Sequence, residues 1–517
     1  MAFKSSFDEL IKDIKSISFS NNPSNGETAQ PASSKPDNGV NMKSKFLETW
    51  NNFRYDMRSD PSFKKDSPLW LLGKCYHLKK PSLSSDTSEN AEGSQQSTSE
   101  SYNMLPKHLK LFLVDFHSKL WFTYRKGFPT LNDTNLTSDT GWGCMLRTAQ
   151  MMIAQSFIVH LLGRNWRWTP SRLSMEQSDI HRNIITWFLD EQNIRCPFSL
   201  HQLTEIGLSY RCKPGNWYGP NTAAYIMQDA LECAKGKTEL LNNIMVYIAQ
   251  DSTVYIDDVI EMCEWKNTAS DADLKTSTTS SNRSVIVLIP VRLGEATLNP
   301  IYIPCIQSML TLDQSVGIMG GKPKHSLYFI GFQDEYLFYL DPHYCQQADH
   351  PAAFKNDLLQ NYHCNSPRKT NISKMDPSCC LGFYCRDYKD FQSFVCEANK
   401  FLSPPKQKMS YPLCLIMKGS ALDHRIRRKS EADSFTVIPT SSDGFTEIEF
   451  NEKTFDTEDK TDGVIAVSDD ESKASSSTDK FSFSLASTKS LLTNIYKSKS
   501  PKPDRKFRSM EEEFELL

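Results

Sequence analysis

The chain has 517 residues, of which 39% are hydrophobic, and its formal net charge at pH 7 is −3. This balance gives no bulk electrostatic reason to expect binding to nucleic acid or to a membrane surface. No apolar run approaches the roughly 20 residues that a membrane-spanning helix needs. The start of the chain lacks the apolar core of a secretory signal, so we expect a cytoplasmic protein whose 14 cysteines are reduced thiols.

Composition divides the chain into a folded domain and two polar extensions. The N-terminal extension, 1–44, is rich in Ser, Asn, Pro and Gly over most of its length and is predicted to be disordered. The tail, 418–517, is rich in Ser, Asp and Lys and has the same prediction. Between them we expect one domain, 45–417, with polar loop insertions at about 82–101 and 268–283.

Helical and extended patterns alternate within the predicted domain. Apolar residues three and four positions apart predict helices, and short β-branched or aromatic runs predict strands. The expected helices are Leu105–Tyr124, Cys144–Leu162, Ser171–Leu189 and Thr222–Ala234, and the expected strands are Val285–Leu293, Tyr328–Phe332, Tyr336–Leu340 and Leu413–Met417. This mixture predicts an α/β chain of the α+β kind.

Cys144 follows a Gly-Trp-Gly turn and stands at the head of an apolar helical run. A helix N-terminus carries unpaired N–H groups and a partial positive charge, and both favour a thiolate, which is the nucleophilic form. Most buried cysteines are inert core residues, which is the alternative here. Gly141 and Gly143 argue against it, because they allow a tight turn that exposes the Cys144 N–H as an oxyanion donor.

Asp341 and His343 lie two residues apart at the end of an expected strand, so their side chains project to one face. His343 would serve as the base for Cys144, and Asp341 would orient the imidazole. Taken alone, Asp-Pro-His also fits a surface turn. Tyr124, about twenty residues before Cys144, is a candidate second oxyanion donor, although ordinary aromatic packing explains it equally well.

Seven short segments of the chain form a distinctive set. They are Phe122–Lys126, Thr137–Arg147, Gly163–Trp168, Asn216–Thr222, Gly320–Pro323, Tyr328–Gly331 and Tyr339–His343. Together they resemble the autophagin family, the autophagy cysteine proteases that act on GABARAP-type ubiquitin-like modifiers. They occur in the order of that family and span roughly 45–417. Leu71–His77 and the long tail resemble the longer C and D subtypes.

The resemblance implies a papain-like cysteine protease fold and a role for each reacting group. It implies that Cys144 is the nucleophile, His343 the base and Asp341 the residue that orients it. It further implies that Tyr124 contributes to the oxyanion hole and that Trp217 covers the nucleophile in the free enzyme. Trp217 also fits a core aromatic residue.

The resemblance also implies a gate over the cleft. A short loop would lie over the cleft until substrate lifts it, and Gly320-Gly321 before it is a hinge signal, although a simple turn explains the pair as well. The loop residues are Lys322, Pro323, Lys324 and His325.

The substrate class also follows from the resemblance. The modifiers are cut after a glycine near their C-terminus, and a narrow slot would pass only a residue without a side chain. We expect both trimming of the precursor and release of the form conjugated to phosphatidylethanolamine. The expected partners are these modifiers, with transient contact to the autophagosomal membrane through the lipidated substrate, and no nucleic acid, cofactor or metal.

The last residues contain an aromatic-x-x-aliphatic pattern, Phe514 and Leu517, behind three acids. Such a segment can add a strand to a sheet edge, and it resembles the modifier-interacting motif of autophagin C-termini. A chance match in an acidic tail is the alternative. A zinc site among Cys379, Cys380, Cys385 and Cys396 is disfavoured because the spacing matches no paired Cys-x-x-Cys site.

Two rival functions remain open at this point. The chain could be a weakly active or autoinhibited scaffold that binds modifiers, with an extension lying over the cleft. It could also be a transferase that passes the acyl group to an amine instead of water. Covalent labelling by a glycine-ended electrophilic probe, and analysis of the products, would distinguish the three.

Overall fold

A computed structural model describes the central part of the chain and short pieces beside it. The described ranges are 47–53, 55–56, 62–64, 66–76, 106–169, 173–265, 282–322, 325–402, 411–433, 438–439 and 446–447. The predicted extension 1–44 and insertion 82–101 lie outside these ranges, as do most of the insertion 268–283 and most of the tail. The described chain divides into two units, Met1–Phe435 and Thr436–Leu517.

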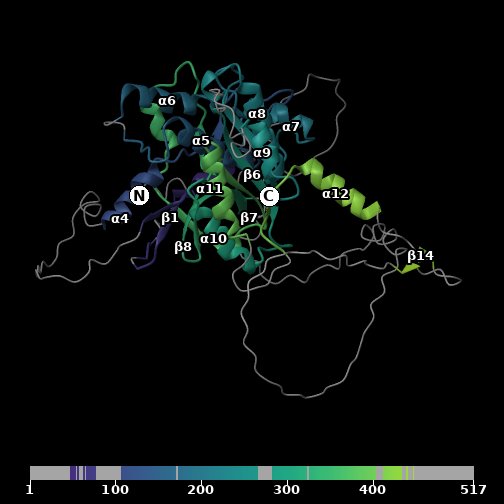
Figure 1. The fold of residues 1–517 in the computed structure, drawn as a ribbon. Coiled ribbons are helices and arrows are strands. Elements are labelled where there is room, and N and C mark those ends of the chain that lie inside the picture. Colours follow the sequence, from purple (N-terminus) through teal and green to yellow (C-terminus); the bar gives the residue numbers. More distant parts are fainter. Residues whose placement is uncertain are drawn as a thin grey trace, which may run out of the picture. The chain divides into compact units, whose positions relative to one another are not determined.

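A mixed sheet forms the centre of the first unit (Figure 1). Among the described residues its strand order is β11-β9-β8-β7-β12-β6-β4, and the hairpin β1–β2 joins it by pairing β1 with β8. Within it β4 and β6 are parallel, while the other neighbours are antiparallel. The strands are β1 (Leu69–Leu71), β2 (Lys74–Tyr76), β4 (Ile244–Ile248), β6 (Ser284–Arg292), β7 (Ser315–Lys322), β8 (His325–Gln333), β9 (Tyr336–Leu340), β11 (Arg368–Asn371) and β12 (Ser378–Cys385).

The remaining described strands form three small pairs. Two of them are parallel, β3 (Tyr124–Lys126) with β10 (Cys345–Gln347) and β5 (Thr253–Tyr255) with β13 (Leu415–Met417). The second unit contains the antiparallel pair β14 (Ile438–Pro439) and β15 (Thr446–Glu447). The pairing of β3 with β10 matters for function, because it ties a segment before Cys144 to the segment after His343.

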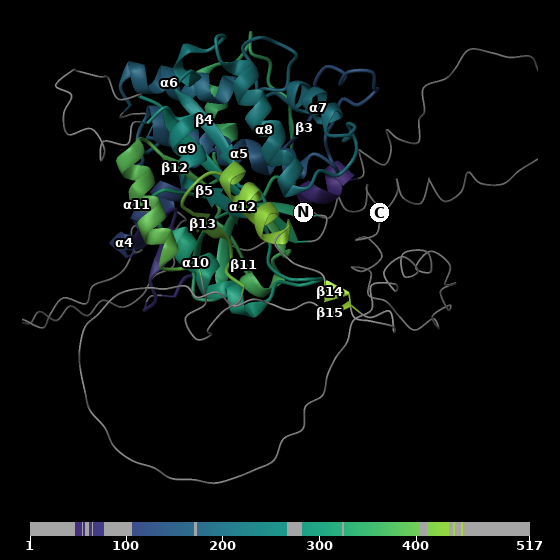
Figure 2. The ribbon, with the colours of Figure 1, turned by 45° about the vertical axis from the view of Figure 1, so that its right-hand side comes forward.

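Helices pack on both faces of the sheet (Figures 1 and 2). The α-helices are α4 (Lys107–His117), α5 (Cys144–Leu161), α6 (Met175–Thr186), α7 (Leu200–Ser209), α8 (Pro220–Ala234), α9 (Ile256–Met262), α10 (Ile303–Thr311), α11 (Tyr388–Asn399) and α12 (Ala421–Asp433). The short 3₁₀ helices are η1 (Glu239–Leu241), η2 (Pro300–Tyr302), η3 (Asn356–Tyr362) and η4 (Ile372–Lys374).

Strand β6 shows how the sheet separates two hydrophobic cores. Ile286 and Leu288 belong to the core that contains α5 and α8, whereas Val287 and Ile289 belong to the core that contains α10 and α11. Successive side chains of a strand point to opposite faces, so a strand covered on both sides reads as a continuous apolar run. The sequence prediction of a buried strand here is confirmed.

Helix α5 is buried along nearly its whole length and packs on β7, β8 and α8. It ends at Leu161, and Gly163 follows with φ of +89°. Glycine takes this left-handed conformation without the cost that a Cβ would add, so it ends the helix as expected. The expected helix Cys144–Leu162 is thus confirmed within one residue.

The expected helix Leu105–Tyr124 is wrong in its second half. Helix α4 ends at His117, and Tyr124 begins strand β3 instead. The Tyr124 N–H donates to the Pro342 carbonyl at 2.8 Å. Long-range pairing of β3 with β10 therefore overrides the local apolar periodicity that predicted a longer helix.

The predicted start of a disordered tail at residue 418 is also wrong, because 421–433 form helix α12. The Ala421 N–H donates to the Asp258 carboxylate at 3.2 Å, and the Ser420 hydroxyl accepts from the Asp423 N–H at 3.1 Å. The His424 ring packs 5.3 Å from the Tyr255 ring. Composition shows that the α12 segment is polar, but it cannot show that Asp258 and Tyr255 of the domain contact the start of this helix.

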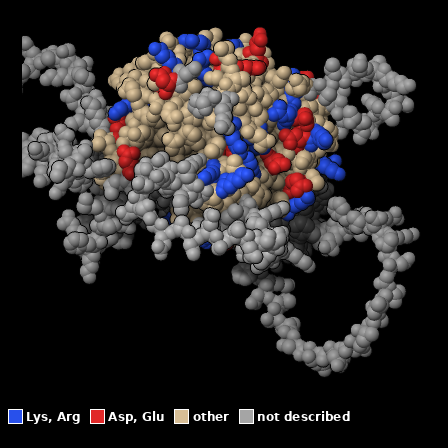
Figure 3. All heavy atoms as spheres, turned by 90° about the vertical axis from the view of Figure 1, so that its left-hand side faces the viewer, with Lys and Arg blue, Asp and Glu red and all other residues tan. Residues whose placement is uncertain are grey.

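Figure 3 shows basic and acidic side chains near one another over much of one face, as the small net charge of −3 suggests. None of the helices that the structure describes has both the length and the apolar character that crossing a bilayer requires.

Candidate active site

The candidate site begins at the first residue of α5. Gly143 is the N-cap residue and makes no side-chain capping hydrogen bond to the N–H groups of the first turn. Cys144 is therefore placed where the helix carries its partial positive charge. Its side chain is only 2% exposed.

A buried ion-pair network fixes the turn before Cys144. Arg147 donates through Nε to Asp139 at 2.9 Å and through its terminal nitrogen to Asp190 at 2.8 Å. The Asp139 carbonyl accepts the Gly143 N–H at 2.9 Å, and a Cβ on Gly143 would collide with the Asp139 carboxylate. Only glycine fits at this position, and the network holds the helix start in one orientation.

The sequence analysis did not predict this ion-pair network, although Asp139 and Arg147 both lie in the segment Thr137–Arg147. An arginine among Met145, Leu146 and other apolar residues at the start of a buried helix is a signal, because arginine is almost never fully buried unless paired. The second carboxylate, Asp190, carries no comparable local signal. Removing one partner would leave an uncompensated buried charge.

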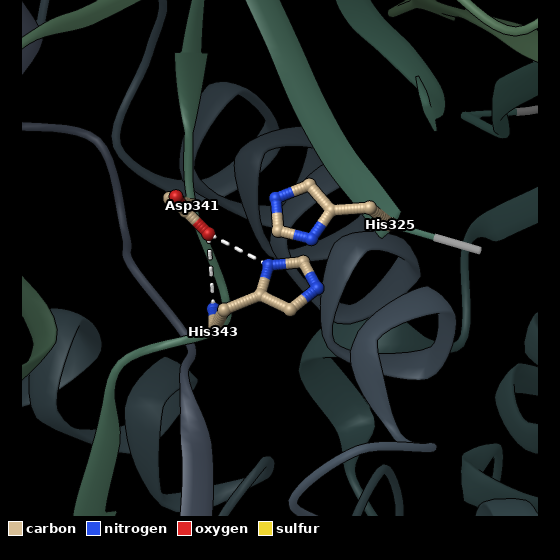
Figure 4. Close-up of side chains that lie close together, drawn as sticks. All are labelled: His325, Asp341 and His343. Carbon is tan, nitrogen blue, oxygen red and sulfur yellow. Dashed lines mark hydrogen bonds and ion pairs between the residues drawn. The ribbon is translucent and has the colours of Figure 1, made fainter. Parts of the chain in front are cut away.

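The sheet supplies the acid and the imidazole (Figure 4). Asp341 follows β9 directly, and its Oδ1 accepts from His343 Nδ1 at 2.7 Å and from the His343 backbone N–H at 3.1 Å. The Trp121 indole donates to the Asp341 carbonyl at 2.7 Å. Asp341 is thus held from both sides and in turn fixes the ring of His343.

The thiol and the imidazole change each other's ionisation. Burial lowers the pKa of His343, but its hydrogen bonds to Asp341 and to Cys144 outweigh this and raise the pKa to about 9. Burial raises the pKa of Cys144, which again disfavours the charged form. The interaction with His343 outweighs burial, and the pKa of Cys144 lies below its usual range. A thiolate–imidazolium pair is therefore favoured at neutral pH.

Tyr124 lies against the same thiol. It forms a small buried cluster with Cys144 and Cys345, and its ring meets the His343 ring edge-on at 5.3 Å. Burial and the neighbouring Cys144 and Asp139 charges raise the pKa of Tyr124 well above its usual value. The phenol therefore stays protonated, which a hydrogen-bond donor requires.

His325 occupies a place that the sequence did not predict. The resemblance implies that it belongs to a loop over the cleft, but it is the first residue of β8. Its ring stacks on the His343 ring with 3.6 Å between the ring centroids and 13° between the ring planes (Figure 4). Lys322 is paired with it as the last residue of β7. Pro323 and Lys324 lie outside the described residues.

His325, Asp341 and His343 also carry ligand atoms within 4.8 Å of one another. The two rings are nearly parallel in a stack, however, so their nitrogens do not converge on one point, and Nδ1 of His343 is already bonded to Asp341. This arrangement suits an oriented catalytic imidazole better than a metal centre.

Comparison with known proteins identifies the fold that carries this site. The peptidase C54 catalytic domain matches residues 109–397, a segment that includes Tyr124, Cys144, Asp341 and His343. The chain belongs to the peptidase C54 family.

Curated relatives of this peptidase C54 chain are named as cysteine proteases. It is 38% identical over 435 residues to cysteine protease ATG4C of Homo sapiens, covering 74% of this chain and 91% of that protein. It is 36% identical over 425 residues to cysteine protease ATG4D of Xenopus laevis, covering 74% and 82%. Cysteine protease ATG4A of Bos taurus matches at 35% over 314 residues, covering 58% and 76%.

These similarities confirm the resemblance to the autophagins, including the C and D branch, and with it the papain-like fold. The chain is an autophagy-related cysteine protease.

Trp217 of this peptidase C54 chain lies at the surface, 48% exposed. It lines a groove of about 810 Å³ together with Gly219, Pro220 and Arg425 of α12. Its covering of Cys144 stays a prediction. The C-terminal pattern, Phe514 and Leu517, lies outside the described residues.

The cysteines of β12 are structural in character. Cys379 and Cys380 are consecutive and belong to the cores on opposite faces of the sheet. Burial raises the pKa of Cys379 to about 12. Thiols that face apart and resist ionisation are poor zinc ligands, since the thiolate is the form that binds metal.

Proposed function

We propose that Cys144 is the nucleophile of this protease, His343 its acid and base, and Asp341 the residue that orients the imidazole. The observation that carries the proposal is the 2.7 Å bond between His343 Nδ1 and the buried Asp341, with Nε2 left for the thiol. This pairing fixes the tautomer and stabilises the imidazolium. The opposite pKa shifts of Cys144 and His343 support it.

The reaction proceeds in two stages. The Cys144 thiolate attacks the scissile carbonyl carbon, and the imidazolium of His343 gives its proton to the leaving amine as the C–N bond breaks. Water then attacks the thioester while neutral His343 takes its proton, and the C–S bond breaks to release the carboxylate. The first stage consumes the thiolate and the imidazolium, and the second stage forms both again, so the reaction requires no cofactor.

Tyr124 and the Cys144 backbone N–H form the proposed oxyanion hole. The phenol lies beside the thiol in a buried cluster, where a hydrogen bond to a developing negative charge is stronger than in water. The raised pKa of Tyr124 keeps its proton in place during attack. Both donors are held before substrate arrives, which is the condition for electrostatic catalysis.

The proposed substrates are GABARAP-type ubiquitin-like autophagy modifiers, cut after a C-terminal glycine. Cys144 is 2% exposed, and the ring of His325 stacks on His343. A site so enclosed favours a residue without a side chain at the scissile bond. The leaving amine can belong to a peptide or to phosphatidylethanolamine, so the same acyl-enzyme serves precursor trimming and release from the autophagosomal membrane.

Gating and docking complete the proposal. Trp217 and the turn between β7 and β8 would move when the modifier tail enters, and Gly321 before the turn has φ of +152°, a conformation that favours glycine.

Phe514 and Leu517 would bind the modifier a second time and raise its local concentration. We expect deletion of 514–517 to weaken modifier binding and leave Cys144 reactivity unchanged.

A modifier ending in glycine and carrying a thiol-reactive electrophile tests the assignment. The full-length chain should be labelled at Cys144, and Cys144→Ala should neither be labelled nor cleave a purified precursor or a modifier conjugated to phosphatidylethanolamine in liposomes. Cys396→Ala, which removes an exposed thiol of α11, is the matched control and should retain both activities. Cleavage of the precursor by Cys144→Ala would disprove the mechanism, and loss of delipidation alone would restrict the substrate class.

One observation favours a second candidate, an autoinhibited scaffold that binds modifiers. Arg425 of α12, which follows the predicted protease domain, lines the same groove as Trp217 and donates to Gln250. If α12 restricts the groove, full-length Arg425→Ala should be labelled faster by the probe. Arg428→Ala, an exposed residue of the same helix, is the control. Equal rates for the two variants would remove this candidate.

A further inference from the structure

A second, separate pocket lies where the β1–β2 hairpin meets the end of α4 and the segment after α5. It has a volume of about 340 Å³, and its charged lining residues are Lys74, Asp115, Lys119, Arg164 and Asp313. We call it the cationic pocket. The lining includes none of the groups of the candidate active site.

The hairpin turn that forms one wall is held in a fixed position. Leu71 pairs with Lys74, so Leu72 and Gly73 form a two-residue turn with φ of 44° and 82°. The Gly73 N–H donates to the Leu310 carbonyl at 3.0 Å, and a Cβ on Gly73 would lie 2.6 Å from the Leu312 carbonyl oxygen. The close approach requires glycine and fixes where Lys74 enters the pocket.

The carboxylate of Asp115 is already fully engaged. It accepts from Lys74 Nζ at 2.7 Å, from the Tyr76 hydroxyl at 2.5 Å and from the Arg167 terminal nitrogen at 2.9 Å. Arg167 Nε also donates to it. Asp115 is therefore ion-paired with Lys74 and Arg167, and it also acts at longer range on Lys119.

Lys119 is the unusual member of this group. Its side chain is 8% exposed and lines the pocket. Among the residues that the structure describes, no carboxylate forms an ion pair with it. The side chain is mostly buried and lines the pocket, and a cation there without an ion-pair partner favours an anion in the pocket.

Its other neighbours add to the positive field. Arg164 donates to the uncharged Ser315 carbonyl at 3.0 Å, and the carboxylates of Asp390 and the exposed Asp313 act on it from a distance. Burial, together with Arg164, Lys74 and Arg167, lowers the pKa of Lys119 to about 8, and Asp115 opposes this only in part. The charged lining residues are three cations and two carboxylates, which leaves one positive charge when Lys119 is protonated.

We propose that the cationic pocket binds a phosphate group, carried either by a soluble phosphate ester or by the headgroup of a phosphoinositide. An anion matches the positive surplus of the lining, and a phosphate group offers three strong acceptor oxygens to the donors of Arg164 and Lys119. Arg164 presents several donors in a plane and Lys119 a compact charge, a combination that suits phosphate oxygens.

Calorimetric titration of the full-length chain with inorganic phosphate and with inositol 4-phosphate tests the proposal. Lys119→Met, which removes the charge and keeps an unbranched side chain one atom shorter, should weaken binding of both by at least about tenfold, since charged phosphate contacts are strong. Lys107→Met is the matched control, an exposed lysine of α4 outside the pocket, and should bind as the parent does. Glycine-probe labelling of Cys144 in both variants verifies the fold.

The source of the phosphate is decided by vesicles. Capture of the parent chain by phosphatidylcholine vesicles containing phosphatidylinositol 4-phosphate, but not by phosphatidylcholine alone, identifies the headgroup. Binding of inositol 4-phosphate without vesicle capture identifies a soluble ester. No binding of any of these probes to the parent chain, or equal binding by Lys119→Met and Lys107→Met, would overturn the proposal.

The unmodified chain provides a test that does not depend on a variant folding. Lys119 must be protonated to bind, so phosphate affinity should fall as pH rises through about 8. Inorganic phosphate becomes more negative as pH rises, so its own ionisation would strengthen binding and does not produce this fall. Phosphate affinity that stays constant between about pH 7.5 and about pH 9 would contradict the role of Lys119.

Discussion

Two thiols of one cluster, Cys144 and Cys345, have opposite ionisation behaviour. Both are buried beside Tyr124, with exposed fractions of 2% and 4%. Burial raises the pKa of Cys345 to about 11, with Glu48 and Asp139 adding to the effect of burial. Burial acts in the same direction on Cys144, yet the pKa of Cys144 lies below its usual range.

The difference comes from the hydrogen-bond partner of each sulfur. Cys345 receives a hydrogen bond from the neutral Thr140 hydroxyl at 3.4 Å. Cys144, in contrast, is the first residue of α5 and its thiol interacts with the imidazole of His343. A charged donor and a helix N-terminus together offset a desolvation cost that a neutral hydroxyl cannot. Depth of burial therefore does not identify the reactive cysteine; the group that faces it does.

Removing the partner should erase the difference between the two thiols. In His343→Ala we expect kcat/KM for the precursor to fall by about 10⁴-fold, because both the thiolate and the general acid are lost. The alkylation rate of Cys144 by iodoacetamide, measured at neutral pH, should fall towards that of Cys345. An unchanged alkylation rate would show that the helix terminus alone ionises the thiol.

Weakening the partner should move the pH dependence as well as the rate. The pKa of His343 is about 9, which is above its usual value. The stability that the imidazolium confers on the fold is therefore fully present below the usual pKa of histidine, and it is lost as pH rises through about 9. In Asp341→Asn we expect kcat to fall by about 10³-fold and the alkaline limb of the kcat/KM profile to move to lower pH. An alkaline limb still near pH 9 would mean that another group holds the proton.

The third member of the cluster separates charge stabilisation from thiol activation. In Tyr124→Phe we expect kcat to fall by about 10²-fold with KM nearly unchanged, the loss typical of one oxyanion donor. Cys144 alkylation should change much less than in His343→Ala. An equal loss of alkylation and turnover would instead give Tyr124 a role in activating the thiol.

Changing the inert thiol should have the smallest effect. In Cys345→Ala we expect activity within about twofold of the parent and a loss of about 1 kcal/mol in the free energy of unfolding, measured by denaturant titration. Mass spectrometry of the native parent after brief alkylation should find Cys345 unmodified. A large loss of activity in Cys345→Ala would mean that the contact of β10 with β3 positions Tyr124.

The sequence predicted the elements whose signal is local. The α5 helix has an unbroken apolar period and a glycine at its end, and β8 and β9 are aromatic runs around a polar turn, so each was predicted within a few residues. Helix α7 and strands β4, β7 and β12 were not predicted. Strand β7 contains three glycines and β12 has three cysteines, so neither reads as a typical strand.

Of the candidate site, the sequence predicted the residues that meet but not all of their contacts. Cys144, Tyr124, Asp341 and His343 do come together. The stacking of His325 on His343 depends on the register between β7 and β8, and the burial of Arg147 depends on Asp190 from another segment. Register and long-range ion pairs have no local pattern, so composition and spacing could not reveal them.

The sequence by itself determined which groups are available and where the chain turns, since Gly143 before Cys144 and Pro342 between Asp341 and His343 act on their own neighbours. Only the tertiary structure decided which of the buried thiols ionises. The parallel pairing of β3 with β10 and the hydrogen bond from Tyr124 to Pro342 bring together segments about 200 residues apart. Ionisation depends on the field at one point in space, and that field exists only after the chain has folded.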